Sequence, residues 1–258
     1  MKSFLFLCLP TVCSFALFNG NPELTTLVGE GILFAKDSDL KMDVGYQKDW
    51  VFDYKLEADT LVDSSFSRSS SITDQAYLEA SWVDRYQIYA TLGSAIFEFS
   101  QDLRSDEVVN YTTKDAFTFG FGGKVMLYQG FGFTVGIDGK YQYACPDIPT
   151  VVKQGEFIPR RRNPEVSIYA WQLGASLAYK LDLISPYIGI NYLNQKAHFQ
   201  RLNRGIVSNL DDDFYAKNRI PVGGFLGFSI TAGKDFSVTV ESRFLSENAL
   251  TLFLDLKF

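Results

Sequence analysis

The chain has 258 residues, of which 47% are hydrophobic and 16% aromatic, and its formal net charge is −6. The acidic residues lie between the apolar stretches and not in one tail, and the negative balance argues against nucleic acid as a partner. No stretch after residue 20 reaches the roughly 18 to 20 consecutive apolar residues of a transmembrane helix. If this chain crosses a membrane, strands must do it.

The first residues carry the pattern of a secretory signal peptide. Met1-Lys2 is followed by an almost uncharged apolar stretch and by the small-x-small sequence Ser14-Phe15-Ala16, so we expect cleavage after Ala16. A membrane anchor is the alternative, but the block is short and Pro10 interrupts it. The chain is therefore expected to divide into a signal peptide (1–16), a periplasmic lead-in or inner plug (17–39), and a barrel (40–258).

The last eleven residues, Asn248 to Phe258, alternate strictly. Leucines at every second position, ending on Phe258, form one apolar face, while Asp255 and Lys257 lie on the other. A strand of this kind fits lipid on one side and water on the other. It resembles the terminal strand of bacterial outer-membrane proteins, which implies that the barrel assembly machinery reads Phe258 as an assembly signal. The edge strand of a soluble sandwich is the alternative.

The same alternation predicts ten strands in all. They are expected at residues 40–56, 75–83, 86–99, 117–127, 131–143, 169–179, 188–192, 222–230, 236–244 and 248–258.

The connections between these strands alternate in length, apart from a short last turn at Ser246-Glu247. Long polar loops are expected at 57–74, 100–112, 146–166 and 199–218, and short turns at Asp84, Gln129, Asp182 and Gly233. Long loops on one rim and short turns on the other are typical of outer-membrane barrels, and an even strand count places both termini on the periplasmic side. The prediction is an all-β fold, a transmembrane antiparallel β-barrel of about ten strands (10–12). Outer-membrane lipid and lipopolysaccharide would surround it.

Several stretches resemble the chlamydial major outer membrane protein family. They are GNPELTTLVGEGILF, MDVGYQKDWVFD, WVDRYQIYATLG, WQLGASLAYKL with SPYIGINY, VTVESRFL and the final DLKF. The resemblance implies a general porin and surface antigen in the bacterial outer membrane. This chain is shorter, its outer loops are trimmed, and it lacks the cysteines by which that family cross-links its envelope. Once residues 1–16 are removed, Cys145 is the only cysteine, so no intramolecular disulfide is expected.

Eleven charged residues in or next to the predicted strands fall on the face away from lipid, where they require water or each other. The candidate lumen-lining residues are Lys41, Asp43, Glu79, Lys124, Asp138, Lys140, Lys180, Glu241, Arg243, Asp255 and Lys257. Either a hydrated pore lined by both signs or a nearly solid, salt-bridged lumen would satisfy them. We expect Glu241, Arg243, Asp255 and Lys257 to pair, since they lie on adjacent strands.

The primary functional hypothesis is a narrow, weakly selective porin-like channel for small solutes, with homo-oligomers possible. The alternative is a non-conducting surface barrel that acts as an adhesin or structural envelope protein. In the loops, Arg160, Arg161 and Arg162 form a basic run that could bind anionic glycans or lipopolysaccharide.

A third reading is an omptin-like protease that uses His198 with Asp211, Asp212 or Asp213. A lone histidine gives little choice of base and no motif of that family is present, so no enzyme activity is expected. No metal or cofactor site is expected either, because Cys145 has no metal-spaced partner.

Overall fold

The computed structural model describes residues 18–22, 40–58, 65–103, 107–158, 164–202, 213–231 and 236–257. The expected signal peptide (1–16), most of the 17–39 segment, the Arg160–Arg162 run and Phe258 lie outside these residues. The described part of the chain contains strands and no helix, and in particular no helix long and apolar enough to cross a membrane.

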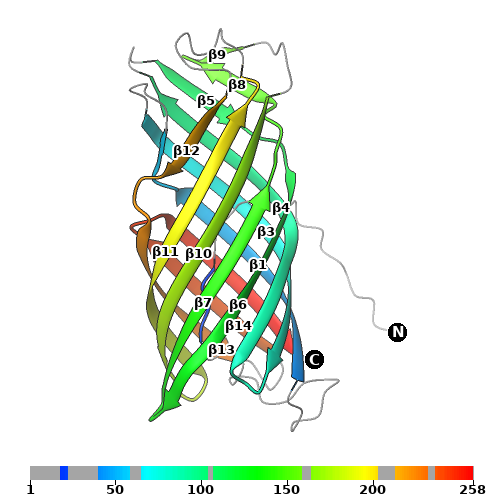
Figure 1. Cartoon of the computed structure of the whole chain (residues 1–258), viewed down its shortest axis with the longest axis vertical. Helices are drawn as coiled ribbons and strands as arrows, with labels where there is room; N and C mark the ends of the chain where they lie inside the picture. Colours follow the sequence, from blue (N-terminus) through cyan, green and yellow to red (C-terminus); the bar gives the residue numbers. More distant parts are fainter. Residues whose placement is uncertain are drawn as a thin grey trace, which may run out of the picture.

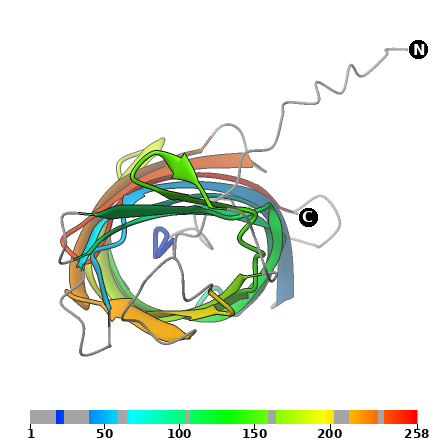
Figure 2. The same ribbon diagram turned by 90° about the horizontal axis from the view of Figure 1, so that it is seen from above.

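Ten long strands close into a single antiparallel barrel (Figures 1 and 2). The barrel is closed by pairing of the first and last strands, with Val44 opposite Leu256 and Trp50 opposite Leu250. The predicted ten-strand fold is therefore confirmed. The strands are β1 (Leu40–Asp53), β3 (Ser65–Trp82), β4 (Tyr86–Asp102), β6 (Ala116–Gly130), β7 (Phe133–Ala144), β10 (Glu165–Tyr179), β11 (Ile184–Gln200), β13 (Val222–Thr231), β14 (Phe236–Phe244) and β15 (Asn248–Lys257).

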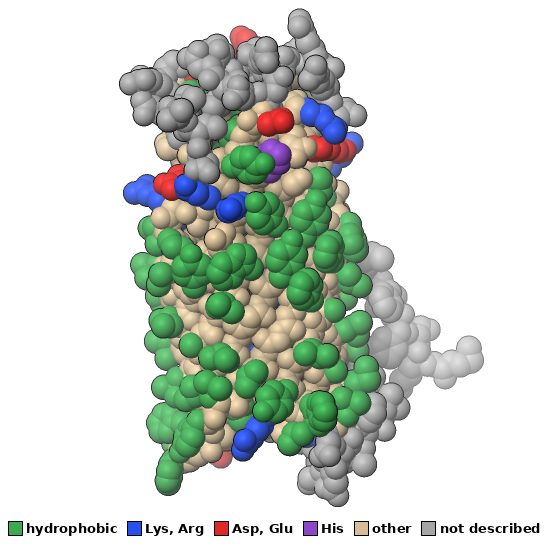
Figure 3. All heavy atoms as spheres, viewed as in Figure 1, with side chains coloured by type: hydrophobic (Ala, Val, Ile, Leu, Met, Phe, Trp, Pro, Cys, Tyr) green, Lys and Arg blue, Asp and Glu red, His purple; other side chains and the backbone are tan. Residues whose placement is uncertain are grey.

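Alternation along each strand separates lipid from lumen. In β4, Ile88 is 69% exposed on the outside, whereas Thr91 is fully buried on the inside. Hydrophobic side chains are spread over the outer wall, and charged side chains gather above them (Figure 3). Closure also pairs the backbone groups that an open sheet edge would leave unsatisfied in lipid. This is the architecture of a transmembrane β-barrel, the class to which outer-membrane proteins belong.

Among the described residues, five short strands extend the wall at the end of the barrel that carries the long connections (Figure 1). β12 pairs with β11 and β2, while β5 pairs with β4 and β8. The short strands are β2 (Leu56–Ala58), β5 (Val108–Thr112), β8 (Thr150–Lys153), β9 (Glu156–Phe157) and β12 (Phe214–Asn218).

These strands correct the prediction that 57–74, 100–112, 146–166 and 199–218 are only loops. β3 begins at Ser65, ten positions before the expected start at Gln75. Its first half alternates buried serines, such as Ser69 and Ser71, with polar outward positions such as Arg68. Above the lipid, neither face of a strand must be apolar, so the period-2 hydrophobic signal that predicts strands is missing there.

The short turns follow backbone geometry. Val83 and Asp84 have φ of 53° and 52°, and the Arg85 N–H donates to the Trp82 carbonyl at 3.1 Å. The next turn lies at Phe131-Gly132 instead of Gln129-Gly130, because Gly132 at φ 81° accepts the left-handed conformation. The turn expected at Asp182 is present, and β11 begins directly after it at Ile184, before the expected start at 188. The expected turn at Gly233 lies outside the described residues.

The orientation of the barrel can be tested with single cysteines in a Cys145→Ser background. Glu156 in β9 and Asp182 in the short turn are both exposed, at opposite ends of the barrel. We expect a membrane-impermeant maleimide to label Glu156→Cys on intact cells and to label Asp182→Cys only after the outer membrane is opened. Labelling of Asp182→Cys alone on intact cells would require the inverted orientation.

Candidate functional site: the barrel lumen

Most of the predicted lumen-lining charges point into the barrel and are buried. This group comprises Asp43, Glu79, Lys124, Asp138, Lys140, Glu241, Arg243 and Asp255. Lys41 is half-buried at the short-turn end, where its Nζ lies 2.5 Å from Asp84 Oδ1. The prediction for Lys180 was wrong, because β10 ends at Tyr179 and the exposed Lys180 lies in the following turn, where water solvates its charge. The side chain of Lys257 lies outside the described residues.

Arg243 is the centre of the largest charge network in the described lumen. Its Nε donates to Glu247 Oε1 at 2.6 Å, and its Nη1 donates to Glu241 Oε1 at 3.0 Å. Asp49 Oδ1 lies 3.6 Å from Nη2. All four side chains are essentially inaccessible to solvent. One cation therefore holds three carboxylates in a region where each would be costly alone.

The expected pairing among Glu241, Arg243, Asp255 and Lys257 is confirmed for Arg243 and Glu241, whereas Asp255 lies away from this network. The register places Asp255 opposite Ser237, whereas Arg243 lies opposite Ala249, further along the strand. The partners that the sequence reasoning missed are Asp49 and Glu247. Asp49 continues the inward series of β1 and could have been found from its position, while Glu247 lies in the connection after β14 and was interpreted as a turn residue.

Glu247 lies outside the strands, and burial raises the pKa of its carboxyl group. The Arg243 guanidinium opposes part of that rise because it stabilises the charged form.

Tyrosines share the lumen with the acidic side chains. Their hydroxyl groups donate to carboxylates and their rings fill space that small side chains would leave open. None of these tyrosines was predicted as a site residue, although each lies on an inward position of its strand. The pairs are Tyr77 with Glu79 at 2.9 Å, Tyr89 with Asp138 at 2.7 Å, and Tyr187 with Glu241 at 3.0 Å.

The part of the lumen toward the short-turn end is called the lower lumen. It also contains buried polar atoms that have no hydrogen-bond partner in the described protein. Both amide atoms of Gln75 and of Gln87, the Nζ of Lys140 and the Oε1 of Gln142 are buried and have no hydrogen-bond partner in the described structure. Buried polar groups of this kind are normally satisfied by internal water. The lower lumen is thus lined by polar and charged side chains.

A short N-terminal segment, Phe18–Pro22, lies inside the barrel (Figure 2). Phe18 stacks on Phe253 with ring centroids 5.1 Å apart, and it shares a buried cluster with Tyr77 and Tyr89. These residues belong to the 17–39 segment that was expected as a lead-in or plug, and the rest of that segment lies outside the described residues.

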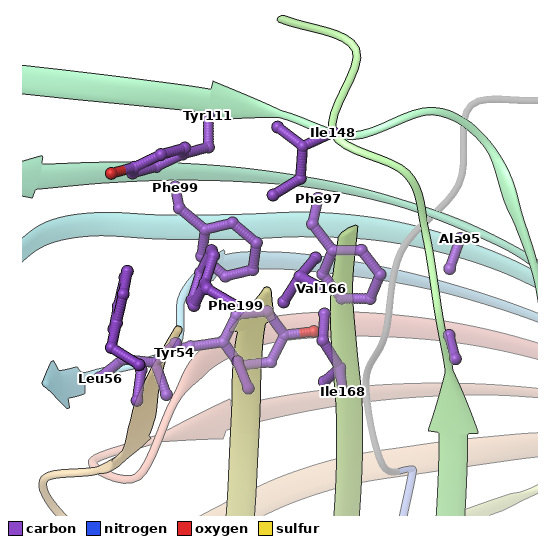
Figure 4. Close-up of a cluster of buried hydrophobic side chains, with 14 of the residues drawn as sticks. Tyr54, Leu56, Ala95, Phe97, Phe99, Tyr111, Ile148, Val166, Ile168 and Phe199 are labelled. Atoms are coloured by element: carbon purple, nitrogen blue, oxygen red, sulfur yellow. The ribbon is translucent and has the colours of Figure 1, made fainter. Parts of the chain in front are cut away.

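The end of the barrel that carries the long connections is called the outer end. It is filled by a hydrophobic core, the outer core (Figure 4). Phe199 lies at its centre, 4.7 Å from Phe214 and 5.2 Å from Phe99 between ring centroids. Side chains of the long strands meet side chains of β2, β5, β8 and β12 in this core. Burial raises the pKa of the Tyr111 hydroxyl and, together with nearby Glu247, that of Tyr54. The interior therefore changes from polar below to apolar above.

The residues considered for loop chemistry are only partly described. His198 stacks on Tyr215 with centroids 4.1 Å apart, and its Nδ1 lies 2.7 Å from Gln200 Nε2. Asp213 accepts the backbone N–H of Arg201, while Asp211 and Asp212 lie outside the described residues. Within the described ranges, no group of three or more His, Cys, Asp or Glu side chains could hold a metal ion.

No protein-family model and no curated protein matches the sequence. Among solved structures, the outer membrane protease OmpT from Escherichia coli is similar at 10% identity and a TM-score of 0.44, covering 85% of this chain and 95% of that chain. The translocator domain of the autotransporter NalP from Neisseria meningitidis is similar at 11% identity and a TM-score of 0.42, covering 86% and 89%.

An outer membrane channel from Pseudomonas putida F1 is similar at 12% identity and a TM-score of 0.43, covering 84% of this chain and 95% of that chain. All three proteins are outer-membrane barrels with different activities. None of these similarities assigns an activity to this chain.

Proposed function

We propose that this protein is an outer-membrane barrel that is closed at rest and displays a structured cap, formed by its short strands, at the cell surface. The observation that carries the proposal is the hydrophobic core across the outer mouth. Phe97, Phe99, Phe199 and Phe214 are all at most 1% exposed. Side chains buried to this degree leave no gap for a solute, because protein interiors are close-packed.

Opening the outer mouth would be costly. Exposing one fully buried aromatic or aliphatic side chain costs about 1.5–3 kcal/mol, and a passage would have to separate several of them at once. The core also joins β2, β5, β8 and β12 to the barrel wall, so opening would undo the cap itself. The cap is therefore an integral part of the barrel, which suits a surface-interaction or structural role.

A porin-like channel for small solutes is the second candidate, and the lower lumen favours it. Charges of both signs and unpartnered amides lie there, as they do along hydrated pores. A permeation path would need to displace Phe18–Pro22 and pass the outer core.

Planar-bilayer recording separates the two functions. We expect folded protein, verified by its heat-modifiable mobility, to give no conductance above the lipid background, because the outer core blocks the lumen. A general porin refolded in the same way serves as the positive control. Reproducible small steps with little preference between anions and cations would contradict the closed barrel and support the porin.

A further inference from the structure

The segment Phe18–Pro22 is bound by specific contacts on the barrel wall. The recognition begins with its backbone. The N–H of Asn19 donates to Glu241 Oε1 at 3.1 Å, and the N–H of Gly20 donates to Glu241 Oε2 at 3.0 Å. The Glu241 carboxylate therefore accepts hydrogen bonds from two consecutive backbone amides, one at each oxygen. Hydrogen bonds to a charged acceptor are stronger than those between neutral groups.

The carboxylate of Glu241 is held in place for this task. Tyr187 donates to its Oε2 at 3.0 Å and Arg243 donates to its Oε1 at 3.0 Å. Both supporting groups are buried members of the barrel wall. A binding group fixed by a supporting layer of hydrogen bonds is characteristic of a preorganised site.

Side-chain contacts make the binding depend on the sequence of the segment. The Asn21 amide donates to the Ser185 carbonyl and to Ser229 Oγ, both at 3.1 Å. Lys124 Nζ donates to the Asn21 carbonyl at 3.3 Å, and the Gln172 amide donates to Asn19 Oδ1. Every one of these wall groups is distant in sequence from the segment, so the site exists only in the closed barrel.

Glycines make the fit tight on both sides. Gly20 has φ +73°, and a Cβ added there would lie 2.8 Å from Lys124 Nζ. On the wall, a Cβ at Gly136 would lie 2.8 Å from Pro22 Cβ, and a Cβ at Gly174 would collide with Asn19 Oδ1. The wall thus leaves room for this backbone and little more.

We propose that the lower lumen is a peptide-binding site whose resting occupant is the chain's own Phe18-Asn19-Gly20-Asn21-Pro22. The wall contacts come from neighbouring strands, running from Lys124 on β6 round to Phe253 on β15. Phe253, on which Phe18 stacks, also contacts the ring of Tyr77 on β3. The segment therefore joins opposite sides of the barrel as an internal strut. A barrel without the segment takes the same pentapeptide from solution.

Peptide binding to a deletion variant tests this site directly. The chain from Glu23 onward is refolded in detergent and titrated with a fluorescent, N-acetylated Phe-Asn-Gly-Asn-Pro peptide. We expect saturable binding, and at least about tenfold weaker binding for the peptide with Gly20→Ala, because this change loses the left-handed backbone and crowds Lys124. Absence of binding to folded barrel, or equal affinity for the two peptides, would overturn the proposal.

Two glycines of β7 provide a matched pair of barrel variants. Gly136→Ala places a methyl group against Pro22, whereas Gly139→Ala faces outward, where the nearest atom is Leu173 Cδ2 at 3.3 Å. In the deletion barrel, Gly136→Ala should weaken peptide binding at least about tenfold, and Gly139→Ala should leave it unchanged. Equal losses of peptide affinity in the two variants would indicate general destabilisation and would contradict a specific binding site.

The chain from Leu17 onward, which keeps the Phe18–Pro22 segment, gives an independent readout if the deletion variant fails to fold. Pro22→Cys is made in a Cys145→Ser background and treated with a water-soluble maleimide. We expect labelling to be at least about tenfold slower than in the urea-unfolded protein, since a docked segment reacts only when it opens. Gly136→Ala should accelerate labelling and Gly139→Ala should not. Fast labelling of Pro22→Cys in the folded protein would show that the segment does not occupy the lumen.

Discussion

Replacing Arg243 with methionine is expected to lower the free energy of unfolding by about 3–5 kcal/mol, the usual cost of removing one partner from a buried ion pair. Arg243 is the shared partner of Glu241, Glu247 and Asp49, and all four side chains are buried. Methionine keeps much of the volume but leaves the three carboxylates without their cation. The loss also reaches the Phe18–Pro22 segment, because Arg243 helps to fix Glu241.

Chemical unfolding in detergent or lipid vesicles, followed by tryptophan fluorescence, measures this loss. Arg201→Met is the matched control, since the Arg201 side chain is 56% exposed where it pairs with Glu165 and solvent-exposed ion pairs contribute only about 0–1 kcal/mol. Adding Glu247→Gln to Arg243→Met should recover part of the stability, because it removes one uncompensated charge. A loss for Arg243→Met no larger than that for Arg201→Met would show that the network is not structural.

The sign of the pH dependence follows from Glu247. Burial raises the pKa of this carboxyl group, and Arg243 opposes the rise. An acid whose pKa is higher in the folded state than in the unfolded state contributes stability at low pH and loses it as pH rises through the folded value. Without Arg243 the pKa of Glu247 rises further. The deficit of Arg243→Met should therefore grow as pH increases from about 4.3, the ordinary glutamate value.

The barrel itself could be predicted from the sequence because lipid imposes a strict rule. Outward positions within the membrane are mostly apolar, so strands such as Asn248–Lys257 show a clean alternation. Above the membrane that rule ends. The first half of β3, which lies above the membrane, has serines on its inward face. No local sequence signal distinguishes this segment from a loop.

The outer core is visible in the sequence as a change in which alternate positions of a strand are apolar. In β4, the apolar residues Ile88 and Leu92 point outward, whereas Phe97 and Phe99 occupy the opposite parity and point inward. The change marks where the strand leaves lipid and where the interior becomes the apolar side. Reading this change along each strand would have predicted a capped mouth.

The peptide site could not be predicted in the same way. Phe18–Pro22 has no periodicity, and its contact with Glu241 spans more than two hundred positions of the chain. Only the closed barrel brings Glu241, Lys124 and Ser229 to one surface. The Asn-Gly-Asn sequence indicates a turn, but it does not indicate what the turn binds.

The outer core provides the second large expected effect, in the variant Phe199→Ala. The Phe199 ring lies within 6 Å of the rings of Phe66, Phe99, Tyr111 and Phe214, so its removal leaves a cavity that several rings border. Truncation of a buried phenylalanine typically costs about 3–5 kcal/mol. We expect a loss of that size in the free energy of unfolding, measured by the same chemical unfolding as for Arg243.

Phe157→Ala in β9 is the control for Phe199→Ala, because Phe157 is 61% exposed and surface substitutions usually change stability by less than about 0.5 kcal/mol. The closed-barrel proposal adds a functional expectation. One missing ring leaves the rest of the core across the mouth, so folded Phe199→Ala should remain non-conducting in planar bilayers. A variant that loses little stability but conducts would show that Phe199 is a gate in an otherwise open lumen, and the porin would then replace the capped barrel as the function of this protein.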